Sequence, residues 1–201
     1  MDIGKVSRVL KGNGYAVSYF ENAREAAAYL NEEIDNKSVG FGDSATLLSM
    51  KLFESLSSHN EVFDPQHCTF GESFTDTAKK CLTTQIFLTS LNALSETGEI
   101  VNIDGTGNRV AGSLFGHEKV FFVAGTNKLI PTLEEAIWRA RNISAPKNAM
   151  RLKLKTPCAK RGERCYDCSS PDRICNSMVI HFKKMSNIDM EVVLINEKLG
   201  Y

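Results

Sequence analysis

The chain has 201 residues, of which 42% are hydrophobic and 24% are charged. That length is enough for one substantial core and too short for two large domains joined by a linker. The 24 acidic and 24 basic residues cancel, so the net charge gives no support to a nucleic acid or a membrane surface as the partner and favours a small molecule or another protein.

The amino-terminal residues 1–17 mix charged residues with glycine and lack the apolar core of a secretory signal. No later segment of the sequence is apolar for long enough to span a bilayer. We therefore expect a cytoplasmic protein. In that reducing compartment, clustered cysteines are more often metal-binding or catalytic than disulfide-bonded.

Strands and helices are predicted to alternate along most of the chain. Short β-branched or uniformly apolar runs predict strands over residues 15–20, 38–43, 61–65, 85–90, 119–125, 178–182 and 190–195. Apolar residues at helical spacing predict helices over residues 21–34, 44–56, 75–82 and 133–143. Thr132 and Glu135 have the spacing of a capping box at the start of the last helix, and we expect Pro146 to end it.

This alternation predicts an α/β fold with a Rossmann-like, mostly parallel sheet, helices on both faces and right-handed crossovers. We expect a single domain over residues 1–201. Two segments break the alternation: the glycine-rich residues 96–112, and a cysteine-rich insert at 156–177 that precedes the closing strands.

The first candidate for chemistry is the turn that follows the strand ending in Gly40 and Gly42. Ser44 comes next, at a predicted helix start, where free backbone N–H groups and the helix dipole favour a phosphate, a carboxylate or the pyrophosphate of coenzyme A. Gly42, Asp43 and Ser44 are therefore candidate ligand-binding residues. A tight turn with a simple helix cap explains the pattern equally well, because a full dinucleotide or P-loop motif is missing.

The second candidate is the polar stretch at 96–112. Glu96, Asp104 and Arg109 are its candidate catalytic residues, since an arginine can hold a carboxylate or phosphate through two hydrogen bonds and a carboxylate can act as a base. The candidate ligand-binding residues around them are Thr97, Gly98, Asn102, Gly105, Gly107 and Asn108. The simpler alternative is a polar β-hairpin, because Asp104-Gly105 is a strong turn signal.

The third candidate is a run of cysteines with the spacing C-x6-C-x2-C-x6-C, formed by Cys158, Cys165, Cys168 and Cys175. Four thiolates suit either tetrahedral zinc or a 4Fe-4S cluster. Basic residues expected to offset the charge of such a centre are Lys160, Arg161, Arg164 and Arg173. The alternatives are a pair of disulfides, which the compartment disfavours, and a redox dithiol, which leaves two cysteines unexplained.

Three stretches resemble the lactate-utilisation (LUD) domain family: residues 89–116, residues 119–152 and the cysteine segment from 156 to 175. The likeness is most specific at ETG, NIDGTGNR and ISAPKNA. The segments 15–30 and 39–47 extend it over nearly the whole chain. The chain is similar to short members that carry an extra four-cysteine segment, and it lacks the tandem ferredoxin cysteine runs of the family's larger iron-sulfur partner.

The resemblance implies a fold like that of the sugar-phosphate isomerases and CoA transferases, with a β-hairpin inserted in the sheet. It also implies an accessory or catalytic oxidoreductase component of a system that oxidises L-lactate to pyruvate, beside an iron-sulfur partner protein. A small anionic 2-hydroxy acid would then lie between the GDS turn and the NIDGTGNR stretch. The resemblance favours iron-sulfur over zinc, as an electron relay rather than a structural clamp.

Two other functions stay open on the same scaffold. One is a non-catalytic ligand-sensing or assembly protein with structural zinc. The other is a sugar-phosphate or CoA-dependent enzyme, for which we require a lysine or histidine beside the acidic loop; Lys119 and Lys128 are near that loop in the sequence. The oligomeric state is also open, a homo-oligomer included.

Overall fold

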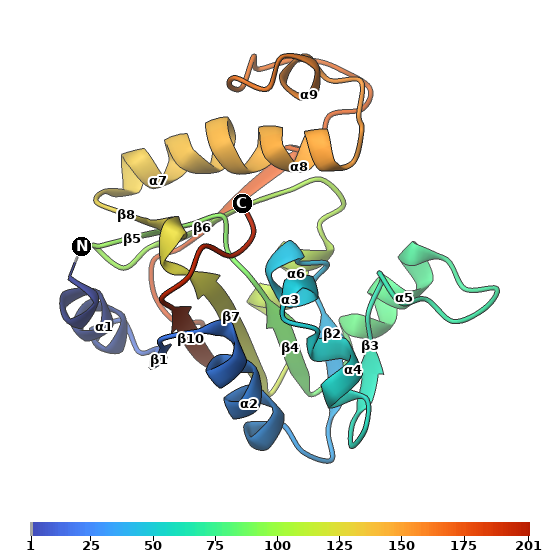
Figure 1. Ribbon diagram of the computed structural model, residues 1–201, viewed down its shortest axis with the longest axis vertical. Coiled ribbons are helices and arrows are strands. Elements are labelled where there is room, and N and C mark those ends of the chain that lie inside the picture. Colours follow the sequence, from blue (N-terminus) through green and yellow to red (C-terminus); the bar gives the residue numbers. More distant parts are fainter. Residues whose placement is uncertain (1) are drawn as a thin grey trace.

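The computed structural model describes residues 2–201, and its helices and two sheets lie in layers (Figure 1). The helices are α1 (Ile3–Gly12), α2 (Ala23–Glu33), α3 (Ala45–Ser49), α4 (Leu52–Leu56), α5 (Phe74–Cys81), α6 (Asn108–Leu114), α7 (Leu133–Arg139), α8 (Ala145–Arg151) and α9 (Pro157–Arg161), with a 3-10 turn η1 (Thr126–Lys128) and a π-helical turn η2 (Ala140–Ser144). The strands are β1 (Ala16–Phe20), β2 (Ser38–Phe41), β3 (Glu61–Phe63), β4 (Ile86–Thr89), β5 (Ala93–Ser95), β6 (Ile100–Asp104), β7 (Lys119–Gly125), β8 (Leu129–Ile130), β9 (Ser177–His181) and β10 (Asp189–Ile195).

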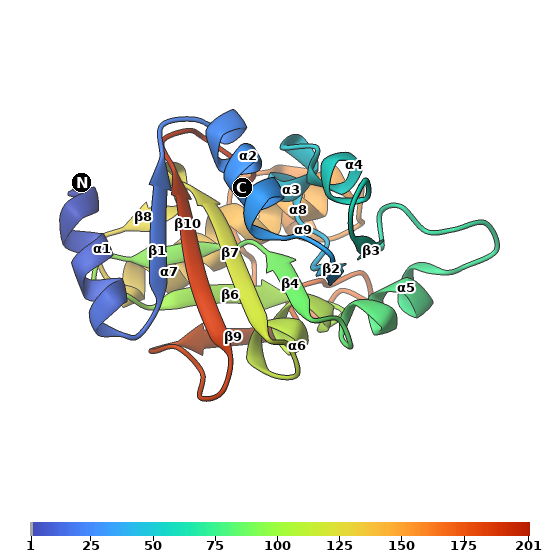
Figure 2. The ribbon, with the colours of Figure 1, turned by 90° about the horizontal axis from the view of Figure 1, so that it is seen from below.

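The larger sheet has the strand order β1-β10-β7-β4-β2-β3, and every neighbouring pair in it is parallel. Figure 2 shows its central strands side by side. Strands β4, β7 and β10 are almost entirely buried, as expected where both faces of a parallel sheet are covered. The predicted Rossmann-like α/β fold is therefore confirmed.

Successive side chains of these strands alternate between two cores. On one face, Phe121 and Val193 pack against Leu30 of α2 and against the buried leucines of α3 and α4. On the other face, Phe122 packs against Leu10 of α1 and against the second sheet. The second sheet in turn carries α7 and η2 on its outer side (Figure 1). The cavity described below lies between these layers.

The second sheet has the order β8-β5-β6-β9 and contains a β-hairpin, β5–β6. Its turn is at Glu96–Gly98, where Gly98 has a φ of +98°, a conformation that favours glycine. The hairpin alternative for Asp104-Gly105 is thus wrong, because these residues lead from β6 into α6. Strand β9, the first of the two closing strands, pairs antiparallel with β6 and so belongs to the second sheet, whereas β10 lies in the larger sheet.

Pro146 does not end the helix that begins after Thr132, contrary to prediction. The helix continues through η2 and α8 to Arg151. Proline has no N–H group to bond the carbonyl four residues earlier, which normally breaks an α-helix. Here the π-helical turn just before Pro146 changes the hydrogen-bonding pattern to a five-residue spacing, and such turns are often found at functional sites.

Two other local features differ from the sequence prediction. Helix α1 was not predicted; the Asp2 side chain caps it by accepting from the backbone N–H of Lys5 at 3.0 Å, and Val6 and Leu10 are its buried residues. The predicted helix from Ser44 is divided into α3 and α4 at Lys51, which has a φ of +54°. The division leaves Leu48 49% exposed. No helix within residues 2–201 is long and apolar enough to cross a membrane.

Candidate functional site

A polar cavity of about 120 Å³ lies at the carboxyl ends of β2, β4 and β7, which are neighbours in the larger sheet. The opposite wall comes from the end of β6, the start of α6 and helix α8. The charged side chains that line it are Asp43, Asp104, Arg109, Lys128 and Arg151. Ligands of α/β proteins commonly bind at this edge of a parallel sheet, so the location agrees with the sequence prediction.

Lys128 is the most unusual side chain of the cavity. It follows β7 in η1, is only 3% exposed, and donates hydrogen bonds from Nζ to Thr46 Oγ1 at 2.9 Å and to Ser90 Oγ at 2.8 Å. Within residues 2–201 it has no carboxylate partner. A buried lysine without a counter-ion is expensive, which marks this position for function rather than stability.

Burial, with the positive charges of Arg139 and Arg109 acting in the same direction, lowers the pKa of Lys128 from 10.5 to about 7. The ammonium and the free amine are therefore both populated near neutral pH. An anion in the cavity would favour the ammonium form, since an opposite charge raises the pKa of an amine.

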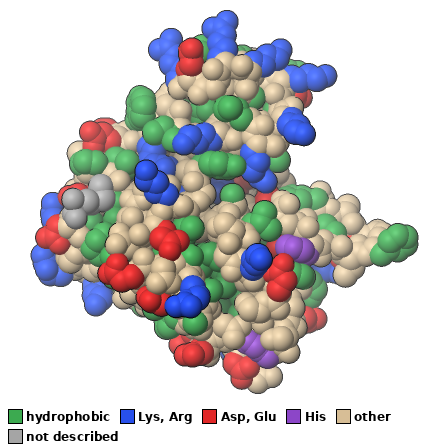
Figure 3. All heavy atoms as spheres, in the orientation of Figure 1, with side chains coloured by type: hydrophobic (Ala, Val, Ile, Leu, Met, Phe, Trp, Pro, Cys, Tyr) green, Lys and Arg blue, Asp and Glu red, His purple; other side chains and the backbone are tan. Residues whose placement is uncertain are grey.

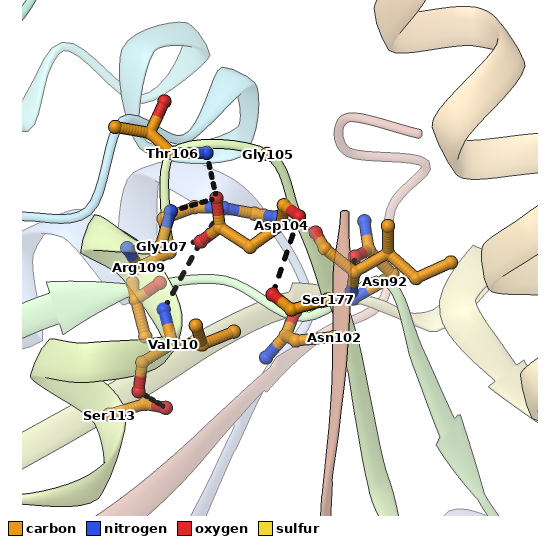
Figure 4. A network of polar contacts seen from close by, with 12 residues as sticks. Asn92, Asn102, Asp104, Gly105, Thr106, Gly107, Arg109, Val110, Ser113 and Ser177 are labelled. Atoms are coloured by element: carbon orange, nitrogen blue, oxygen red, sulfur yellow. Dashed lines mark hydrogen bonds and ion pairs between the residues drawn. The ribbon is translucent and has the colours of Figure 1, made fainter. Parts of the chain in front are cut away.

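Asp104, at the end of β6, organises the loop into α6 (Figure 4). Its carboxylate is 6% exposed and accepts four backbone N–H groups, from Thr106, Gly107, Arg109 and Val110, at 3.0 to 3.2 Å. Gly107 precedes the first residue of α6 with a φ of +94°, where glycine is favoured. Asp104 is thus engaged in shaping the loop, and its lone pairs are largely used.

The arginines of the site differ in how many partners their guanidinium groups have. Arg109 lies 3.7 Å from the Asp104 carboxylate through Nε and donates from Nη2 to the carbonyl of Ile103. Arg139 is buried behind the cavity, where it donates to the carbonyl of Asn92 and to Ser144 Oγ at 2.8 Å. Arg151 bonds only the Asn148 amide oxygen, at 3.0 Å, among residues 2–201. Arg151 is therefore the cation with most of its donors free.

Asp43 contributes a carboxylate at the mouth of the GDS turn. It has a φ of +49° and accepts a 2.5 Å hydrogen bond from Gln66. Burial raises the pKa of Asp43, and Arg151 and Arg109 partly oppose that shift. Both arginines line the same cavity as Asp43, so the cavity combines three cations with two carboxylates.

The predicted site residues fall into three groups in the structure. Those that line the cavity are Asp43, Ser44, Asp104, Gly105, Asn108 and Arg109. Those that lie next to it without lining it are Gly42, Asn102 and Gly107. Glu96, Thr97 and Gly98 lie at the hairpin turn beside α1, where Glu96 pairs with Lys5 at 3.2 Å and the Gly98 carbonyl accepts from Asn13. The structure does not bring this last group to the cavity.

Sequence reasoning missed Thr46, Ser90 and Arg151, and it noted Lys128 only by its place in the chain. One signal was present. Lys128 is a single charge between the apolar run ending at Gly125 and the apolar Leu129 and Ile130. Thr46 and Ser90 carry no such signal.

The cysteine segment packs against α8, on the side of that helix that faces away from the second sheet (Figure 1). Figure 3 shows Lys and Arg side chains gathered over this end of the molecule. All four cysteines are partly buried and free. Of the basic residues expected to face them, Arg161 and Arg164 instead lie over the Tyr166 ring, whereas Arg173 donates to the carbonyls of Cys168 and Cys175.

Three of the four thiols lie near one another. Cys165 and Cys175 line a second cavity together with Arg141 and Arg173. Burial raises the pKa of the Cys175 thiol; Arg173 opposes that shift, and Cys165 and Cys168 add to it. Cys158 contacts Thr156 Oγ1 at 3.2 Å. Within residues 2–201, however, no three His, Cys, Asp or Glu side chains are grouped closely enough to hold a metal ion.

The end of the cysteine segment is attached directly to the Asp104 loop. Asn176 donates its backbone N–H to the Asp104 carbonyl at 3.0 Å and its amide to the Gly105 carbonyl at 3.1 Å. A Cβ atom on Gly105 would lie 2.8 Å from the Ile174 carbonyl oxygen, so only glycine permits this approach. Ile174 itself lines the first cavity. Cys175 is therefore one residue away from a cavity wall.

Comparison with known proteins gives one family and one solved structure. A family model described as "LUD domain" matches residues 3–195. A crystal structure of a DUF162 family protein from Deinococcus radiodurans is similar with a TM-score of 0.55 and 13% sequence identity, over 96% of this chain and 95% of that one. No curated protein matches. At that identity, the solved structure supports the fold alone.

Proposed function

Because the chain belongs to the LUD domain family, which is implicated in lactate utilisation, we propose that its polar cavity binds a small carboxylate of the L-lactate and pyruvate class. The chain would act as an accessory or catalytic component of lactate oxidation. The family gives the metabolic context. The chemistry of the cavity supports the ligand class.

The observation that carries the proposal is the environment of Lys128 in the cavity. Its ammonium is buried, has only hydroxyl partners among residues 2–201, and lines a cavity that also contains Arg109 and Arg151. A carboxylate placed there would supply the missing counter-charge, and a charged hydrogen-bond partner contributes more than a neutral one. The hydroxyls and amides of the lining, including those of Asn92 and Asn108, suit the hydroxyl or carbonyl oxygen of such an acid.

Substitution of Arg151 with glutamine should weaken the binding of L-lactate about tenfold, the lower end for a charge-assisted hydrogen bond because the side chain is only partly buried. Isothermal titration calorimetry of the wild type and the variant measures the effect. The matched control is Arg141→Gln, which removes an arginine that lines the second cavity and pairs with Asp167. Equal affinity in wild type and Arg151→Gln would remove Arg151 from the site.

A second function is favoured by one observation. The sugar-phosphate alternative requires a lysine beside the acidic loop, and Lys128 and Asp104 line the same cavity. The same titration therefore includes a pentose phosphate as a third ligand. Tighter binding of the sugar phosphate than of both acids would favour an enzyme of that class over the lactate system.

We further propose that the four-cysteine segment holds a metal centre, either a 4Fe-4S cluster or zinc. The donor set fits the chemistry, because four thiols with two nearby arginines suit either group. Among the described residues, 2–201, the side chains do not form a ligand set, so binding requires the irregular residues 162–176 to close around the metal. An iron-sulfur cluster would supply one-electron transfer; zinc would supply rigidity.

Purification without oxygen should yield a brown protein that contains iron and acid-labile sulfide, or a colourless one with one zinc ion per chain. The absorption spectrum and metal assays decide between them. Cys168→Ser should lose most of the metal, whereas the control Cys68→Ser, outside the segment, should retain it. A metal-free wild type with all thiols titratable would contradict both forms of the proposal.

A further inference from the structure

Lys128 is placed to react with its ligand as well as to attract it. Its Nζ is tetrahedral. One of the four directions is the bond to the side-chain carbon, and two others point along the hydrogen bonds to Thr46 and Ser90. In the neutral amine both N–H bonds are used in this way, and the nitrogen lone pair takes the remaining direction. Because Lys128 lines the cavity, a ligand carbonyl there can meet the lone pair.

The two hydroxyls are fixed as acceptors for the lysine. Ser90 Oγ donates its own proton to Thr46 Oγ1 at 3.3 Å, and Thr46 Oγ1 donates to the carbonyl of Leu199. Neither hydroxyl therefore donates to Nζ and occupies its lone pair. This chain of hydrogen bonds holds the amine in one orientation. Burial and neighbouring cationic groups, both present here, are what activate a lysine as a nucleophile.

We propose that Lys128 forms an imine with the carbonyl carbon of a bound 2-oxo acid such as pyruvate. The inference rests on the proposed function, because Arg151 and Arg109 would hold the acid's carboxylate while the adjacent carbonyl faces Nζ. The nitrogen attacks the carbonyl carbon, a C=N bond replaces the C=O bond, and the oxygen leaves as water with the two amine protons. No electrons are transferred, so no co-reactant is needed.

The environment supports this chemistry by two further features. The lowered pKa of Lys128, about 7, leaves a large fraction of free amine at neutral pH, whereas an ordinary lysine is almost fully protonated there. Asp43 lines the same cavity, and burial raises the pKa of its carboxyl group. L-Lactate has no carbonyl carbon and cannot form the imine.

Lys119 provides a contrast within the same chain. It is also partly buried, but its Nζ pairs with Glu33 at 3.0 Å and with Glu191 at 2.9 Å. Their carboxylates raise the pKa of Lys119 against the effect of burial. A lysine held in this way stays charged and has no free lone pair, so it should not react.

The test is reductive trapping. The wild type is incubated with pyruvate and sodium cyanoborohydride near pH 7, and the intact mass and the peptide map are recorded. We expect one adduct per chain, heavier by pyruvate less one oxygen atom, on the peptide that contains Lys128 and not on the one that contains Lys119. L-Lactate should give no adduct, and neither should Lys128→Met with pyruvate.

Calorimetry on the same samples separates this inference from the proposed function. If pyruvate binds but no adduct forms at Lys128, or if the adduct lies on other lysines, the imine is ruled out and the carboxylate site stands. If neither acid binds and no adduct forms, both proposals fail. The wild-type peptide map decides the matter even if Lys128→Met does not fold.

Discussion

Replacement of Lys128 with methionine should stabilise the folded chain near pH 6, even though it removes two hydrogen bonds. The pKa of Lys128 falls from 10.5 in the unfolded chain to about 7 in the fold, so the folded state must bury a charge that the unfolded state keeps in water. A shift of that size corresponds to up to about 5 kcal/mol. The loss of the bonds to Thr46 and Ser90 reduces the net gain by about 1 kcal/mol for each.

The burial of Lys128 should also make the free energy of unfolding depend on pH. Between the folded pKa of about 7 and the unfolded pKa of 10.5, the unfolded chain binds the proton and the folded chain does not. The free energy of unfolding of the wild type should therefore rise with pH across this range. Below it both states are protonated, so the whole penalty is present. Lys128→Met should lack this rise.

Denaturant unfolding at a series of pH values measures both effects. Lys183→Met, a substitution of an exposed lysine, is the control and should change the free energy of unfolding by less than about 0.5 kcal/mol. A Lys128→Met variant that is less stable than the wild type near pH 6 would show that the ammonium is well compensated. In that case its burial would be no sign of function.

Asp104→Ala should lower the free energy of unfolding by about 3 to 5 kcal/mol, as expected when one partner of a buried ionic network is removed. The substitution leaves four backbone N–H groups of the α6 loop without their acceptor and Arg109 without its counter-ion. It also weakens the loop to which Asn176 is bonded. We expect the start of α6 and the end of the cysteine segment to lose order together.

Denaturant unfolding and amide hydrogen exchange test this prediction. Asp43→Asn is the matched control, because it alters a carboxylate of the same cavity that accepts one side-chain hydrogen bond, and asparagine tolerates the left-handed conformation at this position. It should cost less than about 1 kcal/mol. Similar losses in both variants would mean that the hydrogen bonds of Asp104 contribute little.

The contrast between these two residues separates stability from function in the cavity. Asp104 was predicted to be a catalytic base, but its lone pairs are taken up by the backbone, so its main effect is on the shape of the site. Lys128 differs from Asp104, because burial of its ammonium lowers the free energy of unfolding. Proteins retain destabilising groups chiefly where an activity depends on them, which makes Lys128 the stronger candidate for chemistry.

The larger sheet was predictable because its strands are uniformly apolar over short lengths, a pattern that few other structures produce. The GDS turn and the NIDGTGNR stretch were expected, on the family resemblance, to hold one ligand between them, and residues of both line the same cavity. The second sheet was only half predicted: a hairpin was expected, but with its turn at Asp104-Gly105 instead of at Glu96–Gly98. The pairing of β9 with β6 joins residues far apart in the sequence.

The rest of the site depends on contacts that no local pattern encodes. Lys128 is buried only because Thr46 and Ser90, distant in the sequence, close over it. Arg151 reaches the cavity only because the helix continues past Pro146 through a π-helical turn. A proline normally predicts a helix boundary, so the sequence argued against the element that carries Arg151.

The most direct test of the carboxylate site is calorimetric titration of the wild type with L-lactate near pH 6 and near pH 8. The titratable or charged groups that face the ligand are Lys128, Arg109, Arg151, Asp43 and Asp104, with Arg139 behind them. Lys128, with a pKa of about 7, changes its charge within this range. We predict saturable binding that is weaker near pH 8 by about tenfold, because the free amine offers no charge to the anion. No binding, or the same affinity at both values, would contradict the account.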